Sequence, residues 1–439
     1  MKVARLAIAL VVTAALAGCA PAPAATPTPA PEATPTPAAE ATPPPAAERE
    51  VEIFTWWTAG GEAEGLAAMV EVFHAQYPQF SFLDASIAGG AGTALRAVLA
   101  TRLAGGDPPS SWQGHAGQAL IGTYVAAGKI QPLNDLFEEE GWLDVMPAQL
   151  IERISHEGNI YSVPVNIHRA NVMWYIPARL AEWGVEPPTT LAEFLTVAET
   201  LQGQGVTPLA MGEQWTSLHL LETVLLGSLG AEAYSALWDG TGDWGSPEVA
   251  SAIETFGSIL EYTNPDASAL SWDAAAQLVI DGAAAFTIMG DWAQGYFKAQ
   301  GILPEGDALG WAPAPGTGGV FQFLSDSFVL PVNARNPEGA LAWLRVAGSK
   351  AGQDAFNPIK GSIPARNDGD RALYDAYLLS AMDDWARDTI VGSLTHGNVA
   401  NDAWKSEIDT ALGLYLADRD AAAFQGALVQ ACLTAGPCD

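Results

Sequence analysis

The sequence predicts an α/β protein whose folded part forms two lobes. After Val51, strand and helix patterns alternate in the βαβα order that is typical of an open, mainly parallel sheet. Later segments keep mixing the two periods. The folded part has about 390 residues, which is large for a single hydrophobic core, so two α/β lobes are expected.

The first elements follow from residue spacing. Residues 51–56, "VEIFTW", are predicted to form a strand. In 62–78 the apolar residues recur at helical spacing until Pro78 stops the helix. Residues 80–87, "FSFLDASI", are the next strand, and a second helix follows the "AGGAG" turn at 88–92 and ends at "GGDPPS".

The later elements have the same mixed character. "NIYSVPVNI" (159–167) and "NVMWYI" (171–176) are predicted strands. Residues 246–264 are a predicted helix with Ser246 as its cap. The segment 278–297 reads as a helix end, a buried strand, a turn and a helix.

Two adjacent tryptophans follow the first predicted strand. In open α/β sheets, ligands lie beyond the carboxyl ends of the strands. Trp56 and Trp57 in "EIFTWWTAGGE" are therefore expected at the rim where a ligand binds.

The charge of the chain argues against several classes of partner. With 19 Lys and Arg against 50 Asp and Glu, the formal net charge is −31. Such a chain repels nucleic acid and anionic lipid, so neither is expected as a partner.

The N-terminus has the features of an export signal. Lys2 and Arg5 precede an apolar run over 6–17 and then "LAGC", which resembles the lipobox of bacterial lipoproteins. This implies a signal peptide at 1–18, acylation of Cys19 and an extracytoplasmic, lipid-anchored protein; ordinary secretion with a free Cys19 is the alternative. The Pro/Ala/Thr-rich residues that follow, up to 50, are predicted to be an extended tether.

The two other cysteines lie close together at the C-terminus. Cys432 and Cys438 in "ACLTAGPCD" are predicted to form a small disulfide loop, because an exported protein meets an oxidising compartment.

Motifs for metal, phosphate and nucleophilic chemistry are missing from the sequence. The six histidines include no HxH or HExxH pattern, and "GGAG" (89–92) lacks the Walker lysine. There is no GxSxG elbow. We therefore expect neither metal nor cofactor, whereas a glycosidase built on paired carboxylates is left open.

Aromatic residues in polar surroundings are the most informative feature. The chain has 15 Trp and 10 Tyr, in stretches such as "SSWQGHAGQ", "GEQWTSLH", "LSWDAAAQ" and "MGDWAQG". Any one of them could simply be core. Together they suit a sugar, whose apolar face stacks on an indole and whose hydroxyls pair with Asp, Glu, Asn, Gln, His and Lys.

These stretches carry a family resemblance that covers nearly all of the folded part. The chain resembles the extracellular solute-binding proteins of bacterial ABC sugar importers, the maltose-binding-protein class, and most of all those that bind glucose, galactose or mannose. The matching pieces, in family order, are "EIFTWW", "GGAGTALRAVLATRLAGGDPP", "QGHAG", "YSVPVNIHRANVMWY", "DGAAAFTIMGDWAQGY", "FLSDSFVLP", "FNPIKGSIPAR" and "VGSLTHG".

The resemblance implies a two-lobed periplasmic-binding-protein fold of class II, with a sugar held in a cleft between lobes joined by crossover strands. The first lobe would comprise 51–162 and 308–350, and the second 163–307 and 351–439. It further implies a monomeric, non-enzymatic receptor that delivers a monosaccharide to an ABC permease. An oligosaccharide receptor and a secreted glycoside hydrolase are the alternatives.

The resemblance also implies roles for individual residues. Trp56, Trp57 and Glu62 would line the first lobe, and Gln113 and His115 would reach the sugar from another strand end. Trp272 would supply the stacking face of the second lobe. Asp326, Lys360 and His396 would bind hydroxyls, and Asn166, Asp291 and Glu64 are further candidates; a structural histidine or a surface lysine is the alternative at His115, His396 and Lys360.

Overall fold

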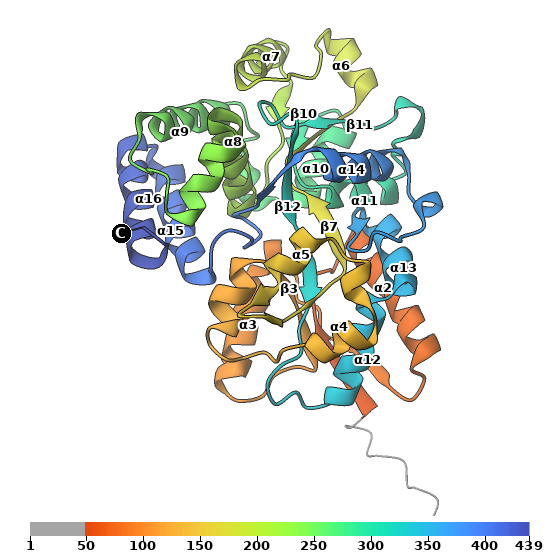
Figure 1. Cartoon of the computed structure of the whole chain (residues 1–439). Helices are drawn as coiled ribbons and strands as arrows, with labels where there is room; N and C mark the ends of the chain where they lie inside the picture. The colour runs from red at the N-terminus through yellow and green to blue at the C-terminus, as the bar shows by residue number, and fades with distance from the viewer. Residues whose placement is uncertain (1–48, 439) are drawn as a thin grey trace, which may run out of the picture. The chain divides into compact units, whose positions relative to one another are not determined.

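The computed structural model describes residues 49–438 (Figure 1). The predicted signal peptide 1–18, the lipidation site Cys19 and all but the end of the predicted tether lie outside the described residues. The first strand, β1, begins at Glu50, the last residue of that predicted tether. Within 49–438, no helix is both long and apolar enough to cross a membrane.

The first sheet has five strands in the order β2-β1-β3-β13-β6. Their bounds are β1 Glu50–Phe54, β2 Ser81–Asp84, β3 Ser111–His115, β6 Val163–Pro164 and β13 Asp326–Phe328. The strands β1, β2 and β3 pair in parallel, as the sequence predicts, but β13 is antiparallel to both β3 and β6. The sheet is therefore mixed, because β13 belongs to a segment that returns from elsewhere in the fold.

Two further sheets have four strands each. The second sheet has the order β11-β8-β10-β9 (β8 Val172–Tyr175, β9 Thr207–Leu209, β10 Ala284–Ile288, β11 Gly310–Pro313). The third has the order β14-β7-β12-β15 (β7 Asn166–Arg169, β12 Val320–Leu324, β14 Ile363–Pro364, β15 Thr389–Gly392). A small hairpin pairs β4 Ser155–His156 with β5 Asn159–Ile160.

Two chain segments connect the three sheets. Residues 163–175 supply β6, β7 and β8, and residues 310–328 supply β11, β12 and β13, so each segment enters all three sheets. We call them the two crossovers, and we call the parts built on the first and second sheets the first and second lobes. The predicted lobe boundaries stay a prediction; β11, which they assign to the first lobe, pairs with β8 of the second sheet.

Helices cover the sheets. Their bounds are α2 Gly60–Gln76, α3 Thr93–Ala104, α4 Asn134–Glu139, α5 Ala148–Arg153, α6 Pro177–Trp183, α7 Leu191–Gly203, α8 Gln214–Asp239, α9 Pro247–Leu260, α10 Trp272–Ile280, α11 Trp292–Ala299, α12 Pro337–Gly348, α13 Lys350–Lys360, α14 Ala376–Arg387, α15 Asp402–Asp418 and α16 Ala421–Ala435. The predicted cap of α9 is confirmed, since Ser246 accepts a hydrogen bond from the Val249 N–H.

The apolar interior forms two clusters. One includes Trp57, Trp112 and Trp343 of the first lobe and continues to Trp174 and Ala284 of the second sheet. The other lies under α8, α9, α15 and α16, which Figure 1 shows grouped together, and includes Trp238 and Trp404. The predicted disulfide between Cys432 and Cys438 is formed at the end of α16.

Glycines allow three helices to meet closely beside the crossovers. A Cβ atom on Gly61 of α2 would lie 2.5 Å from the Ile359 carbonyl, and one on Gly295 of α11 would lie 2.5 Å from the Lys360 carbonyl. Both obstacles are backbone of α13, which cannot move aside as a side chain can. This junction fixes the positions of Glu62, Trp292 and Lys360, which are neighbours of these glycines in the sequence or in space.

We predict that Gly295→Ala lowers the free energy of unfolding. The added methyl overpacks a backbone contact, which costs about 1–3 kcal/mol and outweighs the gain in helix propensity. Gly426→Ala on α16 is the matched control, because nothing lies within 4 Å of the added atom. Urea unfolding of both variants checks this; equal stability for the two would contradict the close junction.

Candidate functional site

A cavity of about 370 Å³ lies where both lobes and both crossovers meet. Its lining comes from chain segments far apart in the sequence: Trp56, Thr58, Ala59, Glu62, Ala88, Gly89, Gly90, Ala91, His115, His168, Glu213, Trp215, Ser271, Trp272, Asp273, Trp292, Leu324, Asp326, Lys360 and His396. The fold thus gathers aromatic, acidic and basic side chains at one place.

Several helices begin at this cavity. The residues just before α2, α8 and α11 are Ala59, Glu213 and Asp291, and none of the three caps its helix with a side-chain hydrogen bond. The first N–H groups of a helix have no partner within the helix. The dipoles of these helices place partial positive charge near the cavity, although the Thr216, Ala293 and Gln294 N–H groups are already bonded to backbone oxygens.

Four indoles form the apolar part of the wall. Trp56 and Trp292 contact histidines, with ring centroids 4.8 Å from His115 and 4.9 Å from His396. Trp272 is half-buried and meets Tyr296 edge-on. Trp215 donates its indole N–H to Glu213 at 3.0 Å.

The carboxylate of Asp326 is the polar centre of the site. It is buried, and its two oxygens accept hydrogen bonds from the side-chain amides of Gln113 and Asn166, each at 2.8 Å. The Asn166 carbonyl oxygen in turn accepts from the Asp326 backbone N–H. Burial alone would raise the pKa of Asp326, but the hydrogen bond and charge of His168, with Lys360 and His115, hold it well below its usual range.

His168 lies between two carboxylates. Its Nδ1 bonds Asp291, whose other oxygen accepts from the Arg169 N–H, and its Nε2 lies 3.4 Å from Asp326. Burial is the largest effect and opposes protonation, but the charge of Asp291 and the hydrogen bonds to Asp291 and Asp326 together outweigh it and raise the pKa of His168. The imidazolium then offsets one of the two negative charges of these buried acids.

Lys360 forms the second ion pair of the cavity. Its Nζ lies 2.7 Å from Glu62 Oε1 and 5.8 Å from the Trp292 ring centroid. Burial raises the pKa of Glu62, and the charge of Lys360 acts against this rise. Because Lys360 is at the end of α13 and Glu62 in the first turn of α2, the close junction of these helices sets this pair.

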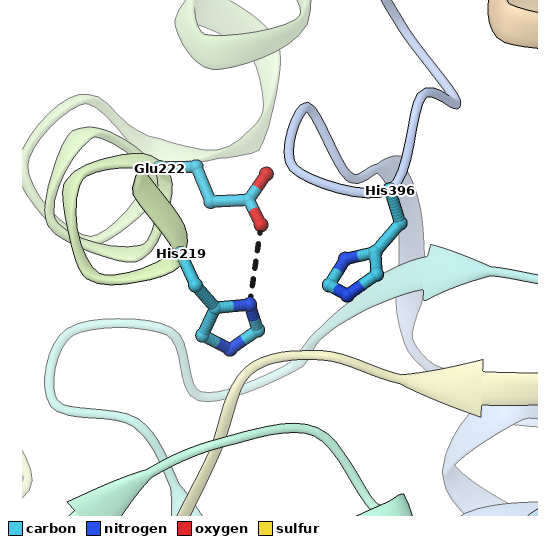
Figure 2. A group of neighbouring side chains, drawn as sticks. All are labelled: His219, Glu222 and His396. Carbon is cyan, nitrogen blue, oxygen red and sulfur yellow. Dashed lines mark ion pairs between the residues drawn. The ribbon is translucent and has the colours of Figure 1, made fainter. Parts of the chain in front are cut away.

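Behind His396 lies a second layer of polar side chains from α8 (Figure 2). Figure 2 shows His219 and Glu222 side by side on the helix, facing His396, and their potential ligand atoms all lie within 4.8 Å of one another. Burial lowers the pKa of His396 well below its usual value, lowers that of His219 to about 4 and raises that of Glu222 to about 7. The neutral imidazoles can therefore each accept one hydrogen bond.

The structure brings seven of the nine principal predicted residues to the cavity wall: Trp56, Glu62, His115, Trp272, Asp326, Lys360 and His396. Trp57 and Gln113 are not in the wall. Trp57 is buried against Phe328 and Phe356, and Gln113 is buried behind Asp326 and also accepts the Trp56 N–H.

The three further candidates also lie outside the wall. Asn166 and Asp291 are fully buried and act through Asp326 and His168. Glu64 is exposed and is not part of the lining. Of the two acids after the tryptophan pair, Glu62 is thus the one at the cavity, because it alone lies where α2 meets α13.

Some lining residues were not predicted as site residues. Glu213 and Trp215 come from the stretch "GEQWTSLH", which the sequence already marks as aromatic in polar surroundings, and Trp292 comes from "MGDWAQG". His168 lies two residues after the predicted Asn166 on β7, within the quoted stretch "YSVPVNIHRANVMWY". A rule that combined such stretches with helix starts would have found Trp215 and Trp292.

Comparison with known proteins agrees with this architecture. Residues 59–354 match the family model for bacterial extracellular solute-binding proteins. An ABC transporter extracellular-binding protein of Pyrococcus horikoshii is 35% identical over 378 residues, which are 85% of this chain and 85% of the relative. A probable sugar-binding periplasmic protein of Brucella suis is 32% identical and covers 82% of this chain and 86% of its own.

A third relative and a solved structure extend the comparison. A xylose/arabinose-binding protein of Haloferax volcanii is 31% identical over 76% of this chain and 73% of its own length. The bacterial solute receptor AcbH, described as preferring β-D-galactopyranose, superposes with a TM-score of 0.77 over 88% of this chain and 98% of its own, at 16% identity. With its sheets, crossovers and central cavity, this chain therefore belongs to the family of bacterial extracellular solute-binding proteins.

Proposed function

We propose that the protein binds a neutral sugar in the central cavity and delivers it to the permease of an ABC transporter. The observation that carries this proposal is that four indoles line one cavity together with Glu62, Asp326 and Lys360. Indoles stack on the apolar face of a sugar ring, and the charged groups match its hydroxyls.

The charge balance of the cavity favours an uncharged ligand. Lys360 pairs with Glu62, and His168 lies between Asp291 and Asp326. Glu213 and Asp273 add negative charge, and no arginine from residues 49–438 is part of the lining. An anionic ligand would meet uncompensated repulsion, whereas hydroxyl groups can donate to the acids and accept from Lys360.

The volume favours a small sugar. A cavity of about 370 Å³ is near the lower end of the ~300–1,000 Å³ usual for small-molecule sites. We therefore favour a monosaccharide of the glucose, galactose or mannose type over an oligosaccharide. Pentoses also belong among the candidates, because the Haloferax relative is named for xylose and arabinose.

Delivery to a membrane permease suits the proposed attachment of the chain. Lipidation at Cys19 and a tether between Cys19 and β1 would keep a monomeric receptor close to the membrane on the extracytoplasmic side. The family and the named relatives are solute-binding proteins, which supports a receptor and not an enzyme.

The glycoside hydrolase alternative finds less support in the site. Both oxygens of Asp326 accept amide hydrogen bonds, and Glu62 pairs with Lys360. An attacking carboxylate and a proton donor both need freedom to reach the glycosidic bond.

We predict that isothermal titration detects binding of at least one neutral monosaccharide. The panel should include glucose, galactose, mannose, xylose and arabinose, with maltose and chitobiose as longer ligands and glucuronate as the anionic control. Tighter binding of a disaccharide would favour the oligosaccharide alternative. An absence of heat with every sugar would contradict the proposal, and turnover of an aryl glycoside would revive the hydrolase.

We predict opposite effects for two tryptophan truncations. Trp272→Ala removes a half-buried cavity indole and should weaken sugar binding by ~1–3 kcal/mol while the apo protein melts almost as before. Trp57→Ala removes a core indole and should cost ~3–5 kcal/mol of stability. Melting temperature and affinity, measured for both, check this; a large loss of stability in Trp272→Ala with affinity retained would remove Trp272 from the site.

We predict that sugar stabilises a closed arrangement of the lobes, as hinge-closing binding proteins do. Gly90 of the first lobe lies against Trp215 of the second, and a Cβ atom there would overlap the indole. Small-angle scattering should show a smaller radius of gyration with sugar for the wild type and for the control Gly203→Ala, which meets nothing within 4 Å. Gly90→Ala should close less and bind more weakly; equal closure would contradict this contact.

A further inference from the structure

The turn that carries His396 is fastened to α8 by one carboxylate. Glu222 is fully buried and accepts hydrogen bonds from the Ser393 hydroxyl at 2.8 Å, the Leu394 N–H at 2.5 Å and the Thr395 N–H at 3.2 Å. Glu222 therefore links the turn 393–395 to α8.

The hydroxyl of Ser393 has one proton to donate and three polar neighbours, of which the His396 backbone N–H donates to its oxygen at 3.3 Å. The same oxygen lies 2.8 Å from Glu222 Oε1 and 2.9 Å from His396 Nδ1. A carboxylate can only accept, so the hydroxyl proton goes to Glu222. The oxygen of Ser393 must then accept from His396, which places the imidazole proton on Nδ1.

The neighbouring His219 allows Ser393 to donate to Glu222, and to accept from His396, even when Glu222 is protonated. The His219 Nε2 lies 3.0 Å from the Ala170 carbonyl, which can only accept, so Nε2 carries the proton of the neutral ring. The bare Nδ1 has no hydrogen-bond partner and lies 3.5 Å from Glu222 Oε1 (Figure 2). A protonated Glu222 can therefore donate its proton to His219 Nδ1, and the Ser393 hydroxyl still donates to Glu222.

We propose that Glu222 and Ser393 are positioning residues that hold His396 in the tautomer with its proton on Nδ1, so that Nε2 presents a lone pair to a sugar hydroxyl. The proposal rests on the proposed function, because His396 lines the sugar cavity. His396 then serves only as an acceptor. It selects a ligand with a hydroxyl group at that point and discriminates against one that offers only an acceptor there, because two lone pairs would face each other.

A bound metal ion is the other interpretation of His219, Glu222 and His396. Their spacing permits an ion, and each imidazole has a second partner of the kind that metal ligands use. However, both oxygens of Glu222 already accept hydrogen bonds from the turn 393–395. A proton shared between Glu222 Oε1 and His219 Nδ1 is enough to explain why these two atoms face each other. The hydrogen-bond arrangement needs no further component, so we favour it and make the ion an outcome of the test.

The test combines nitrogen NMR of the full-length protein with sugar titration. In histidine-labelled wild type without sugar, His396 should show a protonated Nδ1 and an unprotonated Nε2; its signal is assigned by its loss in His396→Asn. Ser393→Ala keeps the bonds from Glu222 to the 394 and 395 N–H groups, so the turn should stay folded. It should move the His396 proton toward Nε2 and weaken binding of the sugar identified by titration about tenfold, the scale of one hydrogen bond.

Thr223→Val is the matched control. Thr223 lies on α8 and, like Ser393, is buried. Its hydroxyl donates to the His219 backbone carbonyl and makes no hydrogen bond to Ser393 or His396. This variant should leave the His396 signals and the sugar affinity unchanged.

A wild-type proton on Nε2, or a Ser393→Ala variant with unaltered signals and affinity, would overturn the inference. So would one equivalent of zinc or another divalent ion in the purified protein that is lost in His219→Ala. The two measurements separate this inference from the proposed function. If no sugar binds in the titration, the proposed function fails. The NMR spectrum of the sugar-free protein still shows whether Glu222 and Ser393 hold the proton of His396 on Nδ1.

Discussion

The buried carboxylate of Asp326 is the constraint on which the rest of the site depends. It begins β13 of the second crossover, and its partner Asn166 begins β7 of the first. A buried charge must be paired and hydrogen-bonded. The hydrogen bonds and the ion pair of Asp326 therefore fix the positions of Gln113 on β3, Asn166 on β7 and His168. These contacts connect both crossovers to the first sheet.

A chain of compensating charges extends from this carboxylate. Asp291 holds His168, and Lys360 reaches both Glu62 and the face of Trp292. The elements that carry these groups also place the cavity indoles: Asp291 immediately precedes Trp292 at the start of α11, and Glu62 lies in the first turn of α2. The starts of α2 and α11 thus position both polar and aromatic parts of the wall.

Much of this could be predicted from the sequence. The two-lobed α/β fold, the parallel order of the first strands and seven of the residues in the cavity wall followed from periodicity and from the resemblance of quoted stretches. The separation of Trp56 from Trp57 could not, because both follow the same strand and only Phe328 and Phe356, distant in sequence, decide which one is core. The antiparallel β13, the role of Trp215 and the support of His396 by Glu222 likewise depend on contacts across hundreds of residues.

The crowding of indoles in the wall has an optical consequence. Four of the 15 tryptophans of the chain line the cavity, and Trp215 hydrogen-bonds a carboxylate there. The emission of an indole depends on the polarity and hydration around it, so a solute that displaces water from these rings changes the intrinsic fluorescence of the whole protein. If the solute binds in this cavity as proposed, the intrinsic fluorescence of the chain therefore reports whether the cavity is occupied, without any added label.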